Sequence, residues 1–294
     1  MPKIKYKTQG FRSRSKRLIE HANSIIDEYT SDGYQLTVRQ LYYQFVARNI
    51  IPNEPNEYTN LCNLVGNARL AGLIDWDAII DRTRNEEGNA HFDDPGSILC
   101  VAAQTYQLDT RATQKTYLEI WVEKEALAGV VGQIANELDI TYLACRGYMS
   151  LTTLWEASQR IRKARQNNQS AVILYLGDHD PSGRDMSRDI RKRLKMLQAS
   201  AEVRRIALTR KQVDRYHLPP NPTKEGDRRA AKYIARHGQN SWELDALSPK
   251  TIDKIIRRAV AKNTDEDRCR KLIKRQERDK LTLDKISKHW KDIV

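Results

Sequence analysis

The feature that most constrains the fold is a regular alternation of short apolar segments with longer amphipathic ones between residues 117 and 208. The apolar segments, which we expect to be strands, are 117–122, 140–145, 171–176 and 203–208. The segments with helical periodicity between them are 125–138, 151–166 and 183–197. Strands that alternate with helices of about 10–15 residues are typical of a parallel sheet with helices on both faces. The sequence therefore predicts an α/β domain with a mostly parallel four-stranded sheet.

The residues before this domain predict a small helical domain. Its expected helices, identified by apolar residues at helical spacing, are 15–29, 37–48 and 57–71. Thr37 and Gln40 form a capping-box pattern at the start of the second helix. A short hairpin is expected at 73–80. Three short helices followed by a hairpin are typical of a winged-helix (CAP-like) domain, which commonly binds DNA.

Changes in composition divide the chain into five parts. The helical periodicity weakens around Asp94, and the chain becomes polar and helical after Leu218. The expected parts are a basic N-terminal helix (1–30), the winged-helix domain (31–92), a linker (93–116), the α/β domain (117–218) and a basic helical C-terminal extension (219–294).

Positive charge is concentrated at the two ends of the 294-residue chain, whose formal net charge is +13. Residues 1–30 contain 7 basic and 3 acidic side chains, and residues 250–294 contain 15 basic and 8 acidic ones. Basic ends of this kind favour binding to a phosphate backbone, because neutralised phosphates release counterions. A solvated, lysine-rich helical surface would have the same composition, so this alternative stays open.

No segment predicts a membrane span or a secretory signal. The longest uncharged apolar run, 171–176, is far too short to cross a bilayer, and no apolar stretch follows the basic N-terminus. We therefore expect a cytoplasmic protein that associates with DNA and has no membrane partner. The 4 cysteines stand apart with no C-x-x-C pair, so we expect reduced thiols and neither disulfides nor a zinc ribbon.

Acidic residues follow two of the expected strands. Glu123 comes after the first strand, and Asp178 and Asp180 come after the third. Because the carboxyl ends of parallel strands meet at one edge of a sheet, we expect these carboxylates to point to one side and form an oxygen cage. Mg²⁺ prefers such oxygen ligands. Asp-x-Asp alone also occurs in capped turns, phosphatases and sugar transferases. His179 has no second His or Cys at ligand spacing, which argues against zinc.

The second expected helix contains a candidate nucleophile. At about 100° per residue, Tyr42 lies near the apolar face of this helix and Tyr43 lies to one side of it. We therefore expect Tyr42 in the core and Tyr43 accessible. Arg39 precedes Tyr43 by one turn, where its charge would favour an ionised phenol or hold a phosphate beside it. An amphipathic tyrosine at a domain interface is the alternative interpretation.

Four stretches occur in the order found in a known family: VRQLYY at 38–43, VEKEA at 122–126, RGY at 146–148 and GDHDPSG at 177–183. The region from about residue 30 to 210 resembles the A subunits of topoisomerase VI and their relatives. These relatives include the meiotic double-strand-break protein and nuclease subunits of plasmid-defence systems. The glutamate together with Asp-x-Asp-Pro-x-Gly resembles the signature of the Toprim domain. The resemblance implies that Tyr43 attacks DNA beside Arg39, and that Glu123, Asp178 and Asp180 bind the metal.

The mechanism that the resemblance implies is transesterification. Mg²⁺, or Mn²⁺ in its place, would bind the scissile phosphate of double-stranded DNA, and Tyr43 would attack it to leave a 5′-phosphotyrosyl end. A homodimer would cut both strands, with the tyrosine of one protomer beside the acids of the other. Lys124 and Arg146, together with Arg39, would contact the DNA backbone, and no residue is placed to read bases.

The chain departs from the family in ways that limit the expected activity. It is shorter than the topoisomerase subunits, has Met149 where the family often has proline, and shows no ATPase. Strand passage would therefore need a separate ATPase subunit. Two alternatives remain, a Toprim nuclease that hydrolyses DNA with metal-activated water and a non-catalytic DNA-binding subunit.

Three further acids have open roles. Glu125 is either a ligand of a second metal ion or a surface residue. The stretch WELDAL at 242–247 is similar to one that follows the Toprim core in several small relatives. Its Glu243 and Asp245 either reach the metal site or have a capping or structural role.

Overall fold

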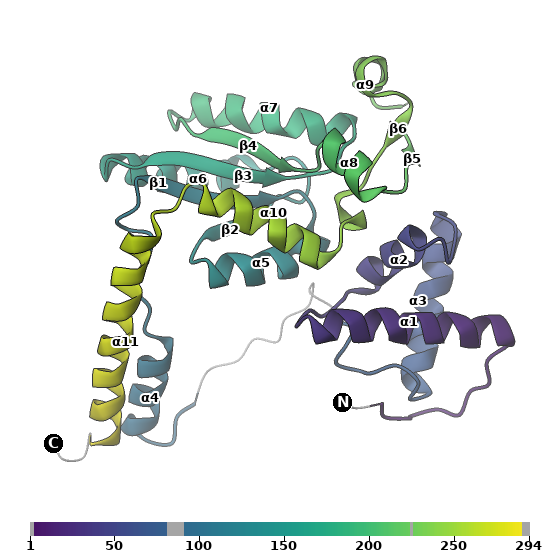
Figure 1. Ribbon diagram of the computed structural model, residues 1–294, viewed down its shortest axis with the longest axis horizontal. Helices are drawn as coiled ribbons and strands as arrows, with labels where there is room; N and C mark the ends of the chain where they lie inside the picture. The colour runs from purple at the N-terminus through teal and green to yellow at the C-terminus, as the bar shows by residue number, and fades with distance from the viewer. Residues whose placement is uncertain (1–2, 81–90, 224–225, 290–294) are drawn as a thin grey trace.

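The computed structural model describes residues 3–80, 91–223 and 226–289. At its centre lies a four-stranded parallel sheet with the strand order β2-β1-β3-β4 (Figure 1). The strands are β1 (Thr116–Val122), β2 (Thr141–Ala144), β3 (Ser170–Leu176) and β4 (Glu202–Ala207). Their ends differ from the expected ones by single residues. The prediction of an α/β fold with a mostly parallel four-stranded sheet is therefore confirmed.

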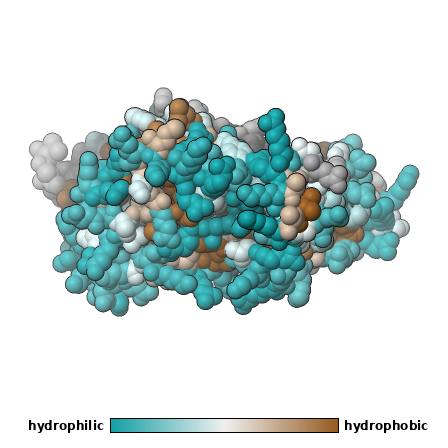
Figure 2. Space-filling model, turned by 90° about the horizontal axis from the view of Figure 1, so that it is seen from above, coloured by the Kyte–Doolittle hydropathy of each residue, from teal (hydrophilic) through white to brown (hydrophobic). Residues whose placement is uncertain are grey.

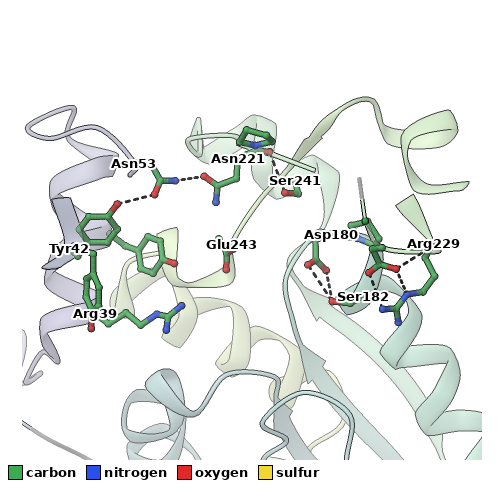
Figure 3. A pocket seen from close by; sticks show the side chains of 15 residues that line it. Arg39, Tyr42, Asn53, Asp180, Ser182, Asn221, Arg229, Ser241 and Glu243 are labelled. Atoms are coloured by element: carbon green, nitrogen blue, oxygen red, sulfur yellow. Dashed lines mark hydrogen bonds and ion pairs between the residues drawn. The ribbon is translucent and has the colours of Figure 1, made fainter. Parts of the chain in front are cut away.

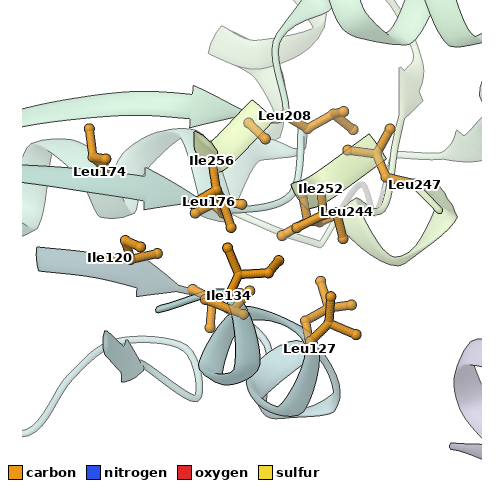
Figure 4. Packing of buried hydrophobic residues seen from close by; sticks show 14 of the residues in the cluster. Ile120, Leu127, Ile134, Leu174, Leu176, Leu208, Leu244, Leu247, Ile252 and Ile256 are labelled. Atoms are coloured by element: carbon orange, nitrogen blue, oxygen red, sulfur yellow. The ribbon is translucent and has the colours of Figure 1, made fainter. Parts of the chain in front are cut away.

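Helices cover both faces of the sheet, because the helices that connect parallel strands pack on its faces. One face packs on η1 (Glu125–Leu127), α5 (Ala128–Glu137) and α10 (Pro249–Ala261), and the other on α6 (Leu151–Gln166) and α7 (Pro181–Met196). On the strands, Ile120 and Leu174 point to the first face and Trp121 to the second. Figure 4 shows the first cluster, in which Ile134 of α5 and Ile256 of α10 approach the sheet.

The N-terminal helices form a separate core of their own. They are α1 (Ser13–Ser31), α2 (Val38–Ala47) and α3 (Pro55–Leu70), and the capping box of Thr37 and Gln40 starts α2 as expected. The hairpin expected at 73–80 is wrong for the described residues. Ile79 forms a parallel bridge with Leu36 instead, because Leu36 uses both its backbone groups to bind Ala78 and Ile80. Residues 81–90 of the expected winged-helix segment lie outside the described part.

The segment 93–116, expected to be a linker, contains helix α4 (Pro95–Thr105). Asp94 caps this helix by accepting a hydrogen bond from the Ser97 amide, and Pro95 occupies its first turn, where a missing N–H costs nothing. A proline that suggests a break in the sequence therefore begins a helix here. In Figure 1, α4 lies alongside α11 (Glu266–Lys288), away from the sheet.

After β4, helix α8 (Arg210–Tyr216) ends the α/β domain. The C-terminal extension then begins with short elements at the carboxyl end of the sheet, before α10 and α11. They are β5 (Asn221–Pro222), α9 (Ala230–His237), β6 (Asn240–Ser241) and η2 (Leu244–Ala246). Between β6 and η2, Trp242 forms an antiparallel bridge with His179, so the extension is tied directly to the loop that follows β3.

Most of the visible surface is hydrophilic, as the 30% content of charged residues leads one to expect. Figure 2 shows that hydrophilic side chains dominate the face seen from above, with small hydrophobic areas between them. Among the described residues, every helix is too short or too polar to serve as a membrane span. The 4 cysteines are free thiols, as expected.

Candidate functional site

Glu123 lies at the end of β1, directly beside the loop that follows β3. Its Oε2 accepts hydrogen bonds from the Asp178 amide (2.9 Å) and from the Tyr175 hydroxyl (3.3 Å). A Cβ atom at Gly177 would lie 2.5 Å from the same oxygen, so only glycine fits this close approach. The parallel pairing of β1 with β3 therefore brings Glu123 to the Asp-x-Asp loop, as the sequence predicts.

The two aspartates of this loop have different partners. Asp180 caps α7, since its Oδ1 accepts a hydrogen bond of 2.6 Å from the Gly183 amide. Asp178 turns toward the C-terminal extension, where its Oδ1 accepts 2.7 Å from the Leu244 amide. The expectation that both carboxylates point to one side is therefore wrong. Within the part of the chain that is described, no group of three or more His, Cys, Asp or Glu side chains is arranged to hold a metal ion.

Lys124 holds a second group of acids together. Its Nζ lies 3.1 Å from Asp178 Oδ2 and 3.5 Å from Asp245 Oδ2, and it also forms an ion pair with Glu243. The Asp245 side chain is fully buried, and neither of its carboxylate oxygens has a hydrogen-bond partner. Its other neighbouring cation is Arg39, whose Nε lies 3.7 Å away. Sequence reasoning gave Lys124 only a role in contacting DNA, and did not anticipate that it neutralises the acids beside it.

Burial is the largest influence on the pKa values of Glu123, Asp178, Glu243 and Asp245. It raises the pKa of Glu123 to about 7, although the Asp178 amide opposes the shift, and the nearby Asp180 carboxylate adds to it. Burial likewise raises the pKa values of Asp178 and Asp245 against the attraction of Lys124. For Glu243, burial is outweighed by Lys124 and the pKa is lowered. Burial therefore favours the protonated forms of Glu123, Asp178 and Asp245, whereas the Glu243 carboxylate is stabilised by Lys124.

The raised pKa of Glu123 predicts how stability changes with pH. The folded protein retains a proton at Glu123 up to about pH 7, whereas the unfolded chain releases it near 4.5. Since the folded state then binds more protons, the free energy of unfolding falls as the pH rises through this window. We expect Glu123→Gln to make the fall less steep. Urea unfolding in EDTA at about pH 5 and about pH 7 measures this, and identical pH dependence in both proteins would contradict it.

Tyr43 is buried, so the expectation that it is accessible is wrong. It exposes 9% of its surface, because the side of α2 that it occupies packs against η2 and Lys124 instead of facing solvent. Lys124 Nζ lies 5.7 Å and Arg39 Cζ 5.9 Å from the centre of its ring. Burial raises the pKa of Tyr43, and the Lys124 and Arg39 charges oppose that shift. Tyr42 is in the core, as expected, and its hydroxyl donates to the Glu54 carbonyl.

A pocket of about 790 Å³ lies between the helical domain and the carboxyl end of the sheet. Figure 3 shows Arg39 and Tyr42 on one side of it, Asp180 on the other, and Glu243 between them. Asn53 of the helical domain hydrogen-bonds Asn221 of β5 across the pocket. The pocket residues that sequence reasoning missed are Asn53, Tyr58, Asn221, Asp227, Arg229 and Ser241. No motif marks them: Tyr58 lies on helix α3, and the others lie in loops or two-residue strands.

Arg146 and Glu125 lie outside this pocket and bind each other. Arg146 Nε and Nη2 donate to the two Glu125 oxygens at 2.7 and 2.9 Å, and this pairing lowers the pKa of Glu125. Glu125 is therefore engaged at the surface and is not among the grouped acids. Arg146 would have to leave Glu125 to hold a DNA phosphate.

His179 is buried, with 1% of its surface exposed. Its Nδ1 lies 2.8 Å from the Tyr233 hydroxyl, and Tyr233 donates to the His179 carbonyl at 2.7 Å. The ring also packs against His237 and Trp242. These contacts give the histidine a structural role in fixing the extension to the Asp-x-Asp loop.

Arg205 of β4 binds the backbone of the Asp-x-Asp loop. Its guanidinium donates to the carbonyls of Gly177 (2.6 Å), Gly183 (2.8 Å) and Leu208 (3.1 Å), and also to that of Asp178. It forms no ion pair with a carboxylate in the described residues. One side chain therefore fixes both ends of the loop that carries the aspartates.

We expect Arg205→Met to lower the free energy of unfolding by about 2 kcal/mol or more, because four carbonyl groups lose a charged donor. Arg204→Met on the same strand is the matched control. Arg204 pairs with Glu202 at the surface, so its loss should cost less than about 1 kcal/mol. Equal losses in urea unfolding of the two variants would show that Arg205 does not support the loop.

Comparison with known proteins adds no identification. No family model, no curated protein and no solved structure matches the chain. The function therefore has to be argued from the chemistry of the pocket itself.

Proposed function

We propose that this protein is an Mg²⁺-dependent enzyme that cleaves double-stranded DNA by tyrosine transesterification. In this proposal α1 to α3 belong to a winged-helix domain, and the sheet belongs to a Toprim domain, as in topoisomerase VI A subunits. The observation that carries it is the position of Tyr43 in one pocket with Arg39, Asp180 and Glu243. A phenol, cations and carboxylates are the groups that such a reaction needs.

Three oxygen atoms next to Gly183 are the starting point for the proposed Mg²⁺ site. Glu123 Oε2, Asp180 Oδ1 and the Asp178 carbonyl lie 2.9, 3.0 and 2.5 Å from the position that a Cβ of Gly183 would take. Glycine leaves the space between these oxygens open. We propose that Glu123, Asp178 and Asp180 would hold Mg²⁺ once the Asp178 carboxylate leaves the Leu244 amide and Lys124, and that the ion would neutralise charge on the scissile phosphate.

The chain's own residues account for the other steps. Lys124 and Arg39 lie next to the Tyr43 ring and act to lower the pKa of its phenol, against burial and the Glu243 and Asp245 carboxylates, which keep that pKa raised. The phenolate oxygen forms a bond to phosphorus and the bond to the 3′ oxygen breaks. That oxygen takes up the proton that the phenol has released, and a 5′-phosphotyrosyl end remains. Arg39 also faces the pocket and is suited to hold the phosphate.

The assembly is also part of the proposal. Tyr43 contacts Lys124 of its own chain, so each chain carries a tyrosine beside a set of acids. A homodimer would then bring two such sites to a duplex, one for each strand. Strand passage is not proposed for this chain alone, because it would need a separate ATPase subunit.

A second candidate function is hydrolysis of DNA by metal-activated water. The observation that favours it is the burial of Tyr43, which raises the pKa of the phenol and disfavours the nucleophilic form. In this case Tyr43 would only contact DNA.

The test is incubation of end-labelled duplex DNA with the protein and Mg²⁺ or Mn²⁺, followed by a denaturing gel before and after protease treatment. Transesterification predicts labelled adducts that protease digests, and none with Glu123→Gln. Free ends without adducts would support hydrolysis. Wild-type protein that binds DNA but never cuts it would contradict both candidate functions.

A further inference from the structure

A second pocket, of about 510 Å³, lies between β4, α8 and α10 and shares no residue with the pocket around Tyr43. Among the residues that the structure describes, five cationic side chains and no acidic one line it. We call it the basic groove and define it by Arg204, Lys211, Arg215, Arg258 and Lys262. Uncharged residues, among them Tyr216 and Ile255, form the rest of its wall.

The charges of the basic groove are largely uncompensated. Arg204 pairs with Glu202 at 2.8 Å, but the other four cations have no ion pair with any described residue. The same helices have paired arginines on their other sides. Arg210 of α8 pairs with Asp214, and Arg257 of α10 pairs with Asp253. Unpaired cations of both helices therefore line the groove, although Lys254 of α10, which also has no ion pair among the described residues, does not.

Uncompensated cations in one groove repel each other, and a polyanion relieves this repulsion. The groove cations come from a strand and two helices, and Lys211, Arg215, Arg258 and Lys262 are exposed. Several cations contributed by three separate elements suit a row of phosphates better than a single ion. Arg215 also lies 5.7 Å from the centre of the Tyr216 ring, which holds its guanidinium at the wall.

We propose that the basic groove binds the phosphate backbone of duplex DNA at a distance from the pocket where cleavage is proposed. Cationic side chains predominate among the described polar residues of the groove, and cations of this kind suit contacts to phosphates. The inference shares with the proposed function only the choice of DNA as the nucleic acid. It requires no chemistry at Tyr43.

The test measures binding of a fluorescently labelled duplex by anisotropy in EDTA, at several salt concentrations, so that no cleavage occurs. The groove variant combines Lys211→Gln, Arg215→Gln and Arg258→Gln. The control combines Arg162→Gln, Lys163→Gln and Arg165→Gln on α6, which removes the same charge from another surface. Thermal unfolding of both variants verifies that they are folded.

We expect the groove variant to bind DNA at least about tenfold more weakly, and its dependence of log Kobs on log salt to become shallower by about 2–3 units. The control should stay close to wild type. Equal weakening in both variants, or none in the groove variant, would overturn the proposal. So would tight binding of inorganic phosphate that the groove variant loses, since this would indicate a site for a small anion. Adduct formation, which tests the proposed cleavage, is measured in a separate assay. A failure of the groove proposal is therefore distinguishable from a failure of the proposed cleavage function.

Discussion

Tyr43→Phe is expected to reduce formation of the protein–DNA adduct by about a thousandfold or more, because the variant lacks the attacking oxygen. The phenyl ring keeps the packing of Tyr43 against Lys124 and Arg39, so the fold and DNA binding should be retained. The measurement is the fraction of labelled DNA that stays protein-linked on a denaturing gel and is released by protease.

Tyr42→Phe is the matched control for this variant. Tyr42 is the adjacent residue, lines the same pocket and is also buried. Its hydroxyl bonds Glu54 and Asn53, so its loss should cost about 1 kcal/mol of stability and leave the adduct intact. Adducts that persist in Tyr43→Phe would exclude Tyr43 as nucleophile. Free DNA ends that persist in Tyr43→Phe but vanish in Glu123→Gln would establish hydrolysis.

Lys124→Met is expected to have the largest effect on stability. Removing the ammonium leaves the carboxylates of Asp178, Glu243 and Asp245 close together, with the Asp245 side chain fully buried. Breaking a buried ion pair on one side costs about 3–5 kcal/mol. We expect a loss of this size at neutral pH in EDTA, measured by urea unfolding.

Two comparisons make this second prediction specific. Lys163→Met, an exposed residue of α6 with no ion pair among the described residues, should change stability by less than about 0.5 kcal/mol. Addition of Mg²⁺ should recover part of the stability that Lys124→Met loses, because a divalent cation replaces the missing charge. A Lys124→Met protein as stable as wild type would show that its ammonium is not needed to neutralise the acids.

Local sequence patterns were sufficient to predict the sheet and the position of Glu123. Strand and helix periodicity depend on neighbouring residues, and parallel strands necessarily bring their carboxyl ends together. The directions of Asp178 and Asp180 were not predictable in this way. Asp178 turns away because the Leu244 amide, 66 residues later, binds its carboxylate, and no local pattern contains this contact.

Burial of Tyr43 illustrates the same limit. The apolar residues of α2 identify the face that packs on α1 and α3. They do not show that the side of α2 carrying Tyr43 is also covered, because the covering residues belong to the α/β domain and the C-terminal extension. Here η2 and Lys124 cover it. Likewise, α4 was missed because the segment has no charged residue and begins with proline and glycine. Its partner α11 lies far away in the sequence.

The pairing of α4 with α11 has a consequence for synthesis of the chain. The Leu108 amide donates to Gln276, which lies 168 residues later. A ribosome that adds about 5–20 residues per second needs roughly 10–30 s to make this interval. During that time the uncharged helix α4 has no partner to cover it. The nascent first half of the protein therefore presents an apolar segment that a chaperone would bind before the last helix emerges.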